Sequence, residues 1–366
     1  MNYYMPVRLY TGRNCISAHK EELRKLGRKC LIVTGGNSAV RSGALGDVTA
    51  VLSELEIDYL QFDKVRSNPT VSGCMESGKQ AAEFGADFII GIGGGSAMDT
   101  AKAASVFAAN IDLDESEFYS RVWKNRPLPV VLVGTTSGTG SEVTNVSVLV
   151  DSKEVKHSIH DELLYSAVSF GDPHYTESLP AGITLSTGVD VLAHCAESFF
   201  SKKANSISRA YSAQGISLLY APLLSAARGE NLEYEQREQL YEASILGGLA
   251  ISVTGTCFPH NVGYFLTENF GVPHGLACAA FFPELISHVK ESDPKYTADF
   301  FSQIGISEQE LLGLISLVMP ELDVHLTEDE ILAALPRWEN NGSVKNTLGT
   351  VTTEDIKKYL RKFIDK

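Results

Sequence analysis

Short runs of apolar residues alternate with amphipathic segments over roughly the first 172 residues of the chain. Uninterrupted apolar runs bounded by turn residues are typical of strands buried on both faces of a parallel sheet. Such runs predict strands at residues 29–34, 57–62, 87–92 and 129–133. Apolar residues at helical spacing predict helices at residues 47–55, 71–84 and 97–108. The alternation predicts an α/β domain with a mostly parallel sheet covered on both faces, and ligands then bind at the carboxyl ends of the strands.

Two further patterns complete the predicted architecture. Residues 147–151 and 155–159 alternate apolar and polar positions around Ser152-Lys153, which predicts a hairpin added to the sheet. After about Pro173 strand-like runs nearly vanish, and helical periodicity dominates from Leu185 onward. A chain of 366 residues is longer than one ordinary hydrophobic core. We therefore expect an α/β domain over residues 1–172 and an all-α domain over residues 173–366.

Composition excludes several classes of protein. Lys and Arg total 31 against 45 Asp and Glu, a formal net charge of −14, and no basic run interleaved with aromatics offsets it. Nucleic acid is therefore not an expected partner. The amino terminus does not resemble a signal peptide, and no apolar run is long enough to span a bilayer. The six cysteines show no CxxC pair, which indicates free thiols in a reducing compartment, so we expect a cytoplasmic protein without membrane partners.

Four residues form a candidate metal site. Asp190 and His194 are four apart in a segment that is predicted to be helical, so their side chains leave one face a turn apart. His260 and His274 flank a segment punctuated by glycine and proline, which indicates a turn that brings the second histidine back toward the first. One carboxylate with three imidazoles suits Fe(II), Zn(II), Ni(II) or Co(II) better than Mg or Ca. An isolated histidine is more often an ordinary hydrogen-bonded residue, and the combination of all four with the loops described next favours the metal.

A glycine-rich stretch, GIGGGSAMDTAK, lies where a predicted strand passes into a helix. The glycines at 93–95 allow backbone N–H groups to approach a pyrophosphate closely, and Ser96 adds a hydroxyl at the positive end of the helix. The stretch is neither GxGxxG nor a Walker loop, which disfavours NTP hydrolysis. A plain tight turn is the alternative. Asp99 is expected to cap the helix or face a ligand, and Lys102 is as readily interpreted as a solvated helix residue.

A second loop, VGTTSGTGSEVT, follows the strand at 129–133 and is rich in hydroxyl groups and glycine. Thr135, Thr136, Ser137 and Thr139 are suited to hydrogen-bond the phosphates or base of a nucleotide. Two such loops at neighbouring strand ends favour a dinucleotide over a mononucleotide, although an ordinary polar loop is the competing interpretation.

Together, GGGSAMDTAK, TTSGTGSEVT, LPAGITLSTGVDVLAHCAESFFS and PHNVGYFLTENFGVPHG resemble the iron-containing, group III alcohol dehydrogenases. The resemblance extends in order from about Leu31 to Leu285. It implies that residues 1–172 form a dinucleotide-binding domain, that residues 173–366 form a helical metal-binding domain, and that the active site lies in the cleft between them.

The resemblance also implies roles for individual residues. It assigns metal binding to Asp190, His194, His260 and His274. It assigns cofactor binding to Asn68 of an Asn-Pro pair, Gly94, Gly95, Ser96, Asp99, Thr135, Thr136, Thr139 and Lys156, the last near the nicotinamide ribose.

Two positions depart from the family pattern. NAD-preferring relatives often carry Asp directly after the first strand, whereas this chain has Gly35, followed by Gly36, Asn37 and Ser38. Backbone N–H and hydroxyl groups there are suited to a 2′-phosphate, so we predict NADP(H) over NAD(H). Many relatives have another histidine, linked to proton relay, where this chain has Tyr264. The relay is then expected to use Tyr264, His157, or the ribose hydroxyl and water.

The function that these features imply is metal-dependent, NAD(P)-linked interconversion of a small primary alcohol and its aldehyde by hydride transfer. Iron is the expected metal, with zinc or nickel as alternatives, and an apolar segment at 251–258 suggests a short aliphatic substrate. Glycerol dehydrogenase-like polyol oxidation and a dehydroquinate-synthase-like lyase remain alternatives, as does a non-catalytic nucleotide-binding relative. The family leads us to expect a homodimer or larger homo-oligomer.

Overall fold

The computed structural model describes residues 3–364 and divides into two compact units. The first unit comprises the chain through Pro180 together with Glu233–Tyr241. The second comprises Ala181–Leu232 and the chain from Glu242 onward. The two are described separately below.

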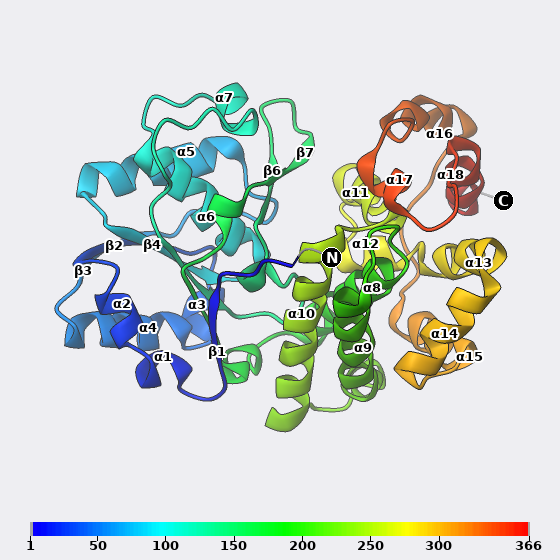
Figure 1. The fold of residues 1–366 in the computed structure, drawn as a ribbon, viewed down its shortest axis with the longest axis horizontal. Helices are drawn as coiled ribbons and strands as arrows, with labels where there is room; N and C mark the ends of the chain where they lie inside the picture. Colours follow the sequence, from blue (N-terminus) through cyan, green and yellow to red (C-terminus); the bar gives the residue numbers. More distant parts are fainter. Residues whose placement is uncertain (1–2, 365–366) are drawn as a thin grey trace. The chain divides into compact units, whose positions relative to one another are not determined.

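The first unit is built on a six-stranded, wholly parallel sheet (Figure 1). Its strand order is β1-β8-β5-β4-β2-β3. The strands are β1 (Arg8–Thr11), β2 (Lys29–Val33), β3 (Asp58–Phe62), β4 (Phe88–Gly93), β5 (Val130–Gly134) and β8 (Val168–Gly171). The helices of this unit are α1 (Cys15–Ala18), α2 (Glu21–Arg24), α3 (Ser38–Arg41), α4 (Ala44–Glu54), α5 (Val71–Phe84), α6 (Gly95–Ala109) and α7 (Glu115–Tyr119).

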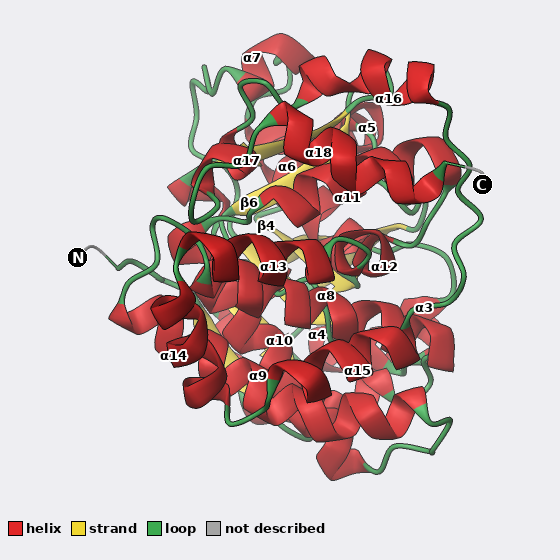
Figure 2. Cartoon of the chain, turned by 90° about the vertical axis from the view of Figure 1, so that its right-hand side faces the viewer, coloured by secondary structure: helices red, strands yellow, loops and turns green. Residues whose placement is uncertain are grey.

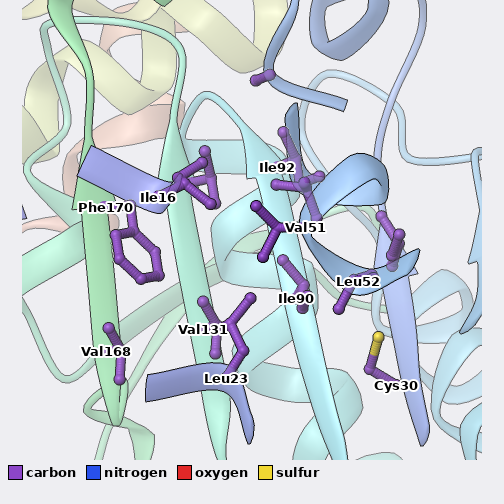
Figure 3. Packing of buried hydrophobic residues seen from close by; sticks show 14 of the residues in the cluster. Ile16, Leu23, Cys30, Val51, Leu52, Ile90, Ile92, Val131, Val168 and Phe170 are labelled. Atoms are coloured by element: carbon purple, nitrogen blue, oxygen red, sulfur yellow. The ribbon is translucent and has the colours of Figure 1, made fainter. Parts of the chain in front are cut away.

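Two apolar layers, one on each face, hold this sheet. On one face Cys30 and Ile90 pack with Leu23 of α2 and Val51 and Leu52 of α4 (Figure 3). On the other face the alternate strand residues, such as Leu31 and Ile89, pack against α5 and α6. Successive side chains of a strand point to opposite faces, so the uninterrupted apolar runs in the sequence supply both layers. The predicted α/β sheet is confirmed.

The structure corrects two details of the sequence-based prediction. The hairpin exists as β6 (Val146–Val150) and β7 (Lys156–His160), but it forms a separate two-stranded antiparallel sheet and is not added to the parallel sheet. It is fastened to α6 instead, because Ser147 Oγ and Val148 N donate to the backbone and side chain of Asp99. Strands β1 and β8 were not predicted. Each is only four residues long, too short for a clear pattern.

The second unit is helical (Figure 2), as the sequence predicts. Its helices are α8 (Ala181–Phe199), α9 (Ser206–Ala227), α10 (Tyr234–Thr254), α11 (Phe258–Phe270), α12 (His274–Ala279), α13 (Phe282–Ser292), α14 (Pro294–Ile304), α15 (Glu308–Val318), α16 (Glu328–Ala334), α17 (Gly342–Asn346) and α18 (Thr353–Leu360). The first residues of α10, through Tyr241, belong to the α/β unit. Tyr241 is anchored there because its hydroxyl donates to the buried carboxylate of Glu142 at 2.7 Å.

Between residues 3 and 364, no single helix has the length and apolar character needed to cross a membrane, although the bent pair α10 and α11 meets those criteria jointly.

Candidate metal centre and nucleotide-binding loops

Three helices of the second unit bring Asp190, His194, His260 and His274 together. Asp190 and His194 lie one turn apart on α8, His260 lies in the first turn of α11, and His274 begins α12. The Nε2 atoms of His260, His194 and His274 lie 3.5, 3.9 and 3.9 Å from Asp190 Oδ1. Atoms that bind one ion at about 2.0–2.2 Å must lie about 3–4 Å apart, so the four side chains are spaced as ligands of a common metal.

Glycines allow these helices to approach so closely. A Cβ at Gly275 of α12 would collide with the carbonyl oxygen of Ser186 on α8. A Cβ at Gly263 of α11 would lie 2.9 Å from the backbone N of Cys278 on α12. Contacts under 3.0 Å are essentially never tolerated, so any side chain at these positions would push the helices apart. The Pro-His-Gly motif thus supplies both a candidate ligand, His274, and the gap that admits it.

Two buried polar atoms in this cluster form no hydrogen bond within the described chain. They are Asp190 Oδ1 and His260 Nε2, in residues that are only 4% and 2% exposed. Leaving such groups unsatisfied is costly, and a cation bound between them would satisfy both. The donor set of one carboxylate and three imidazoles fits a divalent transition metal. The His274 side chain is 28% exposed, so the cluster opens to solvent on that side.

Burial and the histidine charges together set the protonation of Asp190. Burial alone raises the pKa of its carboxyl, but His194, His274 and His260 outweigh that effect and lower the pKa well below its usual value. Asp190 is therefore a carboxylate, the form that binds a cation.

Glu197, which the sequence did not single out, contacts the ring nitrogen of His260 that does not face Asp190. It lies seven residues after Asp190 on the same face of α8 and is fully buried. Its Oε1 lies 2.6 Å from His260 Nδ1, and its Oε2 accepts a hydrogen bond from the backbone N–H of Cys257 at 2.7 Å. When His260 Nδ1–H donates to this carboxylate, the lone pair of Nε2 points toward Asp190, which is the tautomer that can bind a metal.

Tyr264 and His157, the two candidates for proton relay, lie in different units. Tyr264 lies one turn after His260 on α11, and its ring stacks on the ring of His274 with centroids 5.2 Å apart. His157 lies on β7 of the α/β unit and pairs with Asp151 at 3.1 Å. Tyr264 is therefore in contact with the candidate metal-ligand cluster through His274.

The two predicted nucleotide loops pack directly on each other at the carboxyl ends of β4 and β5. A Cβ at Gly95, the first residue of α6, would lie 2.7 Å from Thr139 Cγ2, and a Cβ at Gly94 would lie 3.1 Å from Thr136 Oγ1. Both positions therefore require a minimal side chain. Ser96 follows in the first turn of α6, at the positive end of a 15-residue helix, where anions are stabilised.

The sequence allowed Lys102 to be interpreted as a solvated helix residue, and the structure shows that it is not. It is fully buried, and its ammonium group donates to the backbone oxygens of Ser141, Thr144 and Val146 at 2.7–2.9 Å. Burial lowers its pKa to about 8, against the opposing influence of Asp99 and Glu142. The surrounding run of small and apolar residues in α6 was the signal in the sequence that this face is buried.

Asp99 shares the same network. Its Oδ1 accepts from Ser141 Oγ at 2.8 Å and its Oδ2 from Val148 N at 2.9 Å. Burial raises its pKa, and the nearby Lys102 ammonium opposes that effect. With both oxygens engaged by the protein, Asp99 fixes the loop after β5 and the hairpin on α6.

A pocket of about 250 Å³ opens beside these loops within the α/β unit. Thr135 lines it, and the Thr135 hydroxyl is buried without a hydrogen-bond partner in the described chain. Asn37 and Ser38, which the sequence suggested, line it as well. Arg41, in the last turn of α3, also lines it and was not predicted, because an isolated exposed arginine carries no pattern.

Gly35 lies between β2 and α3, at a position where a side chain does not fit. A Cβ built there would collide with the carbonyl oxygen of Val65. Gly36 follows with φ +53°, a conformation that favours glycine. An acidic side chain at position 35 is therefore incompatible with this backbone.

Asn68 and Lys156, which were assigned to the cofactor from separate parts of the sequence, are neighbours. Lys156 Nζ donates to Asn68 Oδ1 at 3.1 Å, and Asn68 adopts φ 57°. The adjacent Pro69 oxygen accepts from Val150 N at 2.8 Å, which ties the Asn-Pro segment to the hairpin.

Comparison with known proteins agrees with this architecture. The iron-containing alcohol dehydrogenase family model matches residues 6–173, and the model for the carboxy-terminal part of the Fe-containing alcohol dehydrogenase family matches residues 184–313. The sulfoacetaldehyde reductase of Bilophila wadsworthia is 35% identical over 285 residues, which are 76% of this chain and 73% of that protein. The 1,3-propanediol dehydrogenase of Citrobacter freundii is 32% identical over 332 residues, 88% and 84% of the two chains. The crystal structure of an iron-containing alcohol dehydrogenase from Thermotoga maritima, 33% identical, has a TM-score of 0.91 and is covered over 99% of both chains.

The fold and the histidine cluster thus define a metal- and nucleotide-dependent oxidoreductase. The chain belongs to the iron-containing alcohol dehydrogenase family. It is an NAD(P)-linked enzyme that interconverts an alcohol and its aldehyde.

Proposed function

We propose that this enzyme reduces a small aldehyde to its primary alcohol, and catalyses the reverse reaction, at the cluster of Asp190, His194, His260 and His274. The observation that carries the proposal is the convergence of three imidazole Nε2 atoms on one buried carboxylate oxygen that has no hydrogen bond. A divalent metal held there, which we propose to be Fe(II), supplies Lewis-acid polarisation of the substrate oxygen, and the nicotinamide donates or accepts the hydride.

The chain's own residues determine how the substrate approaches. His274 is the exposed member of the cluster, so substrate oxygen enters from its side, next to the Tyr264 ring. The Tyr264 hydroxyl is the protein group proposed to exchange the substrate proton with solvent. Hydride transfer requires the nicotinamide to reach this substrate, so both units serve one reaction.

The cofactor is proposed to be NADP(H). Gly94, Gly95 and Ser96 cradle the pyrophosphate, Thr135, Thr136 and Thr139 face it from the neighbouring loop, and Lys156 with Asn68 serves the nicotinamide ribose. At the other end, Gly36, Asn37, Ser38 and Arg41 supply N–H, hydroxyl and guanidinium donors for a 2′-phosphate. The steric exclusion of an acidic side chain at Gly35 supports this preference.

The substrate can be proposed more narrowly than alcohols and aldehydes in general. The sequence relatives act, by their names, on sulfoacetaldehyde and on 1,3-propanediol, so both the sulfonated aldehyde and 3-hydroxypropanal belong in a test panel with propanal and glycerol. We propose a short uncharged aldehyde, with polyol oxidation as the second candidate.

The experiment loads purified protein anaerobically with Fe(II) or Zn(II) and follows NADPH and NADH oxidation against this panel. Metal-dependent turnover that prefers NADPH is expected, and it disappears in His260→Ala. His325→Ala is the matched control, because that histidine lies in the same unit with 66% of its side chain exposed. Activity that survives in His260→Ala would refute the assigned site. Subunit assembly as a homodimer and a cytoplasmic location stay predictions for light scattering and cell fractionation.

A further inference from the structure

A cysteine shares the metal-ligand cluster. Cys278 lies one turn after His274 on α12 and is fully buried. Its Sγ lies 3.7 Å from His274 Nδ1 and 3.8 Å from His274 Nε2. The donor atoms of Asp190, His260, His274 and Cys278 all lie within 4.8 Å of one another.

Two sets of four donors therefore overlap in the same space. Asp190, His260 and His274 belong to both, while His194 completes one set and Cys278 completes the other. A buried cysteine is often only a small apolar residue. Here, however, Cys278 shares a cluster with Asp190 and His260, and each of these two residues has a buried atom, Asp190 Oδ1 and His260 Nε2, that forms no hydrogen bond in the described chain.

We propose that Cys278 is a metal ligand, and that it binds Zn(II) or Co(II) as a thiolate together with Asp190, His260 and His274. This inference rests on the proposed function, because it concerns the metal of the same site. When the metal–sulfur bond forms, the S–H bond breaks and its proton passes to solvent, and no electron is transferred. Thiolate ligands favour Zn(II) and Co(II), whereas Fe(II) is well served by the nitrogen and oxygen donors that include His194.

The consequence is that the identity of the metal selects the ligand set. With Fe(II), Cys278 remains a thiol beside the centre. With Zn(II), Cys278 takes a coordination position, so the two loaded forms differ at the atoms that surround the substrate.

The first test uses the wild-type chain, so it does not depend on a variant that folds. X-ray absorption of the Zn(II)-loaded protein is expected to show one sulfur scatterer at about 2.3 Å, the usual Zn–S distance. A shell of nitrogen and oxygen alone would overturn the proposal.

The second test is the optical spectrum of the Co(II)-loaded protein. A thiolate-to-cobalt charge-transfer band is expected in the wild type, lost in Cys278→Ser and retained in His194→Ala. Cys74→Ser is the matched control, because Cys74 is also fully buried in a helix but lies in the α/β unit, and its spectrum is expected to equal that of the wild type. An equal band in Cys278→Ser would contradict the assignment. The preference of the site for Zn(II) over Fe(II), measured by competition between the two ions, is expected to fall by about tenfold or more in Cys278→Ser.

These readouts are separable from the proposed function. Metal-dependent aldehyde reduction without a sulfur ligand would refute the role of Cys278 alone. A sulfur ligand in a protein that reduces none of the aldehydes would refute the proposed reaction alone.

Discussion

Replacing Glu197 by glutamine is expected to weaken metal binding although Glu197 is not among the proposed ligands. Its two oxygens have distinct partners: Oε2 accepts from Cys257 N–H, and Oε1 lies 2.6 Å from His260 Nδ1. A backbone N–H can only donate, so the glutamine oxygen must stay with Cys257. The glutamine NH₂ group then faces His260 Nδ1, which must accept, and the ring proton moves to Nε2. A protonated Nε2 cannot bind a metal.

The size of the loss in metal affinity follows from the free energy needed to turn the glutamine amide the other way. Turning the amide restores the metal-binding tautomer but sets the NH₂ group against Cys257 N–H, and a buried donor left unsatisfied costs about 1–3 kcal/mol. Each 1.4 kcal/mol is about a tenfold change, so metal affinity is expected to fall about 10- to 100-fold, as is usual for such supporting carboxylates.

The assay is calorimetric titration of metal-free Glu197→Gln with Zn(II), and of Glu308→Gln as the control. Glu308 lies in the same unit and only pairs with Lys290 near the surface, so its variant is expected to bind metal as the wild type does. Wild-type affinity in a folded Glu197→Gln would refute the tautomer argument. Folding is checked by circular dichroism.

Three other residues, Arg41, Tyr264 and Lys102, give testable predictions. Arg41→Ala is expected to raise KM for NADPH by about tenfold or more, because it loses a hydrogen bond between charged groups, and to leave KM for NADH unchanged. The control is Arg24→Ala, at an exposed arginine. Equal effects on both cofactors would place Arg41 away from the 2′-phosphate. Tyr264→Phe keeps the ring on His274 and is expected to lower kcat about 100-fold without changing metal affinity, if its hydroxyl relays the proton; an unchanged kcat assigns the relay to another group. Lys102 has a folded-state pKa of about 8 against 10.5 for the unfolded chain, so the unfolded chain binds more protons between those values and stability rises with pH across them. The wild type is therefore expected to gain up to about 3 kcal/mol of unfolding free energy over Lys102→Met from pH 8 to 10.5 in denaturant titrations, and a difference that does not vary with pH would contradict this.

The parts of the fold that could be predicted are those encoded by local pattern. The strands at the centre of the sheet are buried on both faces, so their sequences are uninterrupted apolar runs. Strand β1, at the sheet edge, has no fully buried residue, and its four residues are too few for a strand pattern to be recognised. The hairpin was visible from its alternation, but its partner was not, because its attachment to Asp99 is a long-range contact.

The candidate ligands were visible for a different reason. Asp190 and His194 have helical spacing, and the Pro-His-Gly motif marks His274. Glu197 and Cys278 have no comparable signature, because what distinguishes them is burial, and for Lys102 only the small and apolar residues around it in α6 indicate burial. An acidic or basic side chain in a helix is ordinarily solvated, and only the packing of α8, α11 and α12, or of α6 under the hairpin, removes these groups from water.

The metal-ligand cluster and its helix packing depend on each other. Gly275 permits α12 to contact α8, and that contact sets His274 and Cys278 beside Asp190. The same contact buries Asp190 Oδ1 and His260 Nε2 without hydrogen bonds, which costs stability in the metal-free chain. A bound cation offsets that cost, because it binds the folded arrangement and not the unfolded chain. The ligand geometry and the closeness of the three helices are therefore one property, and the metal that satisfies the cluster also stabilises the unit that builds it.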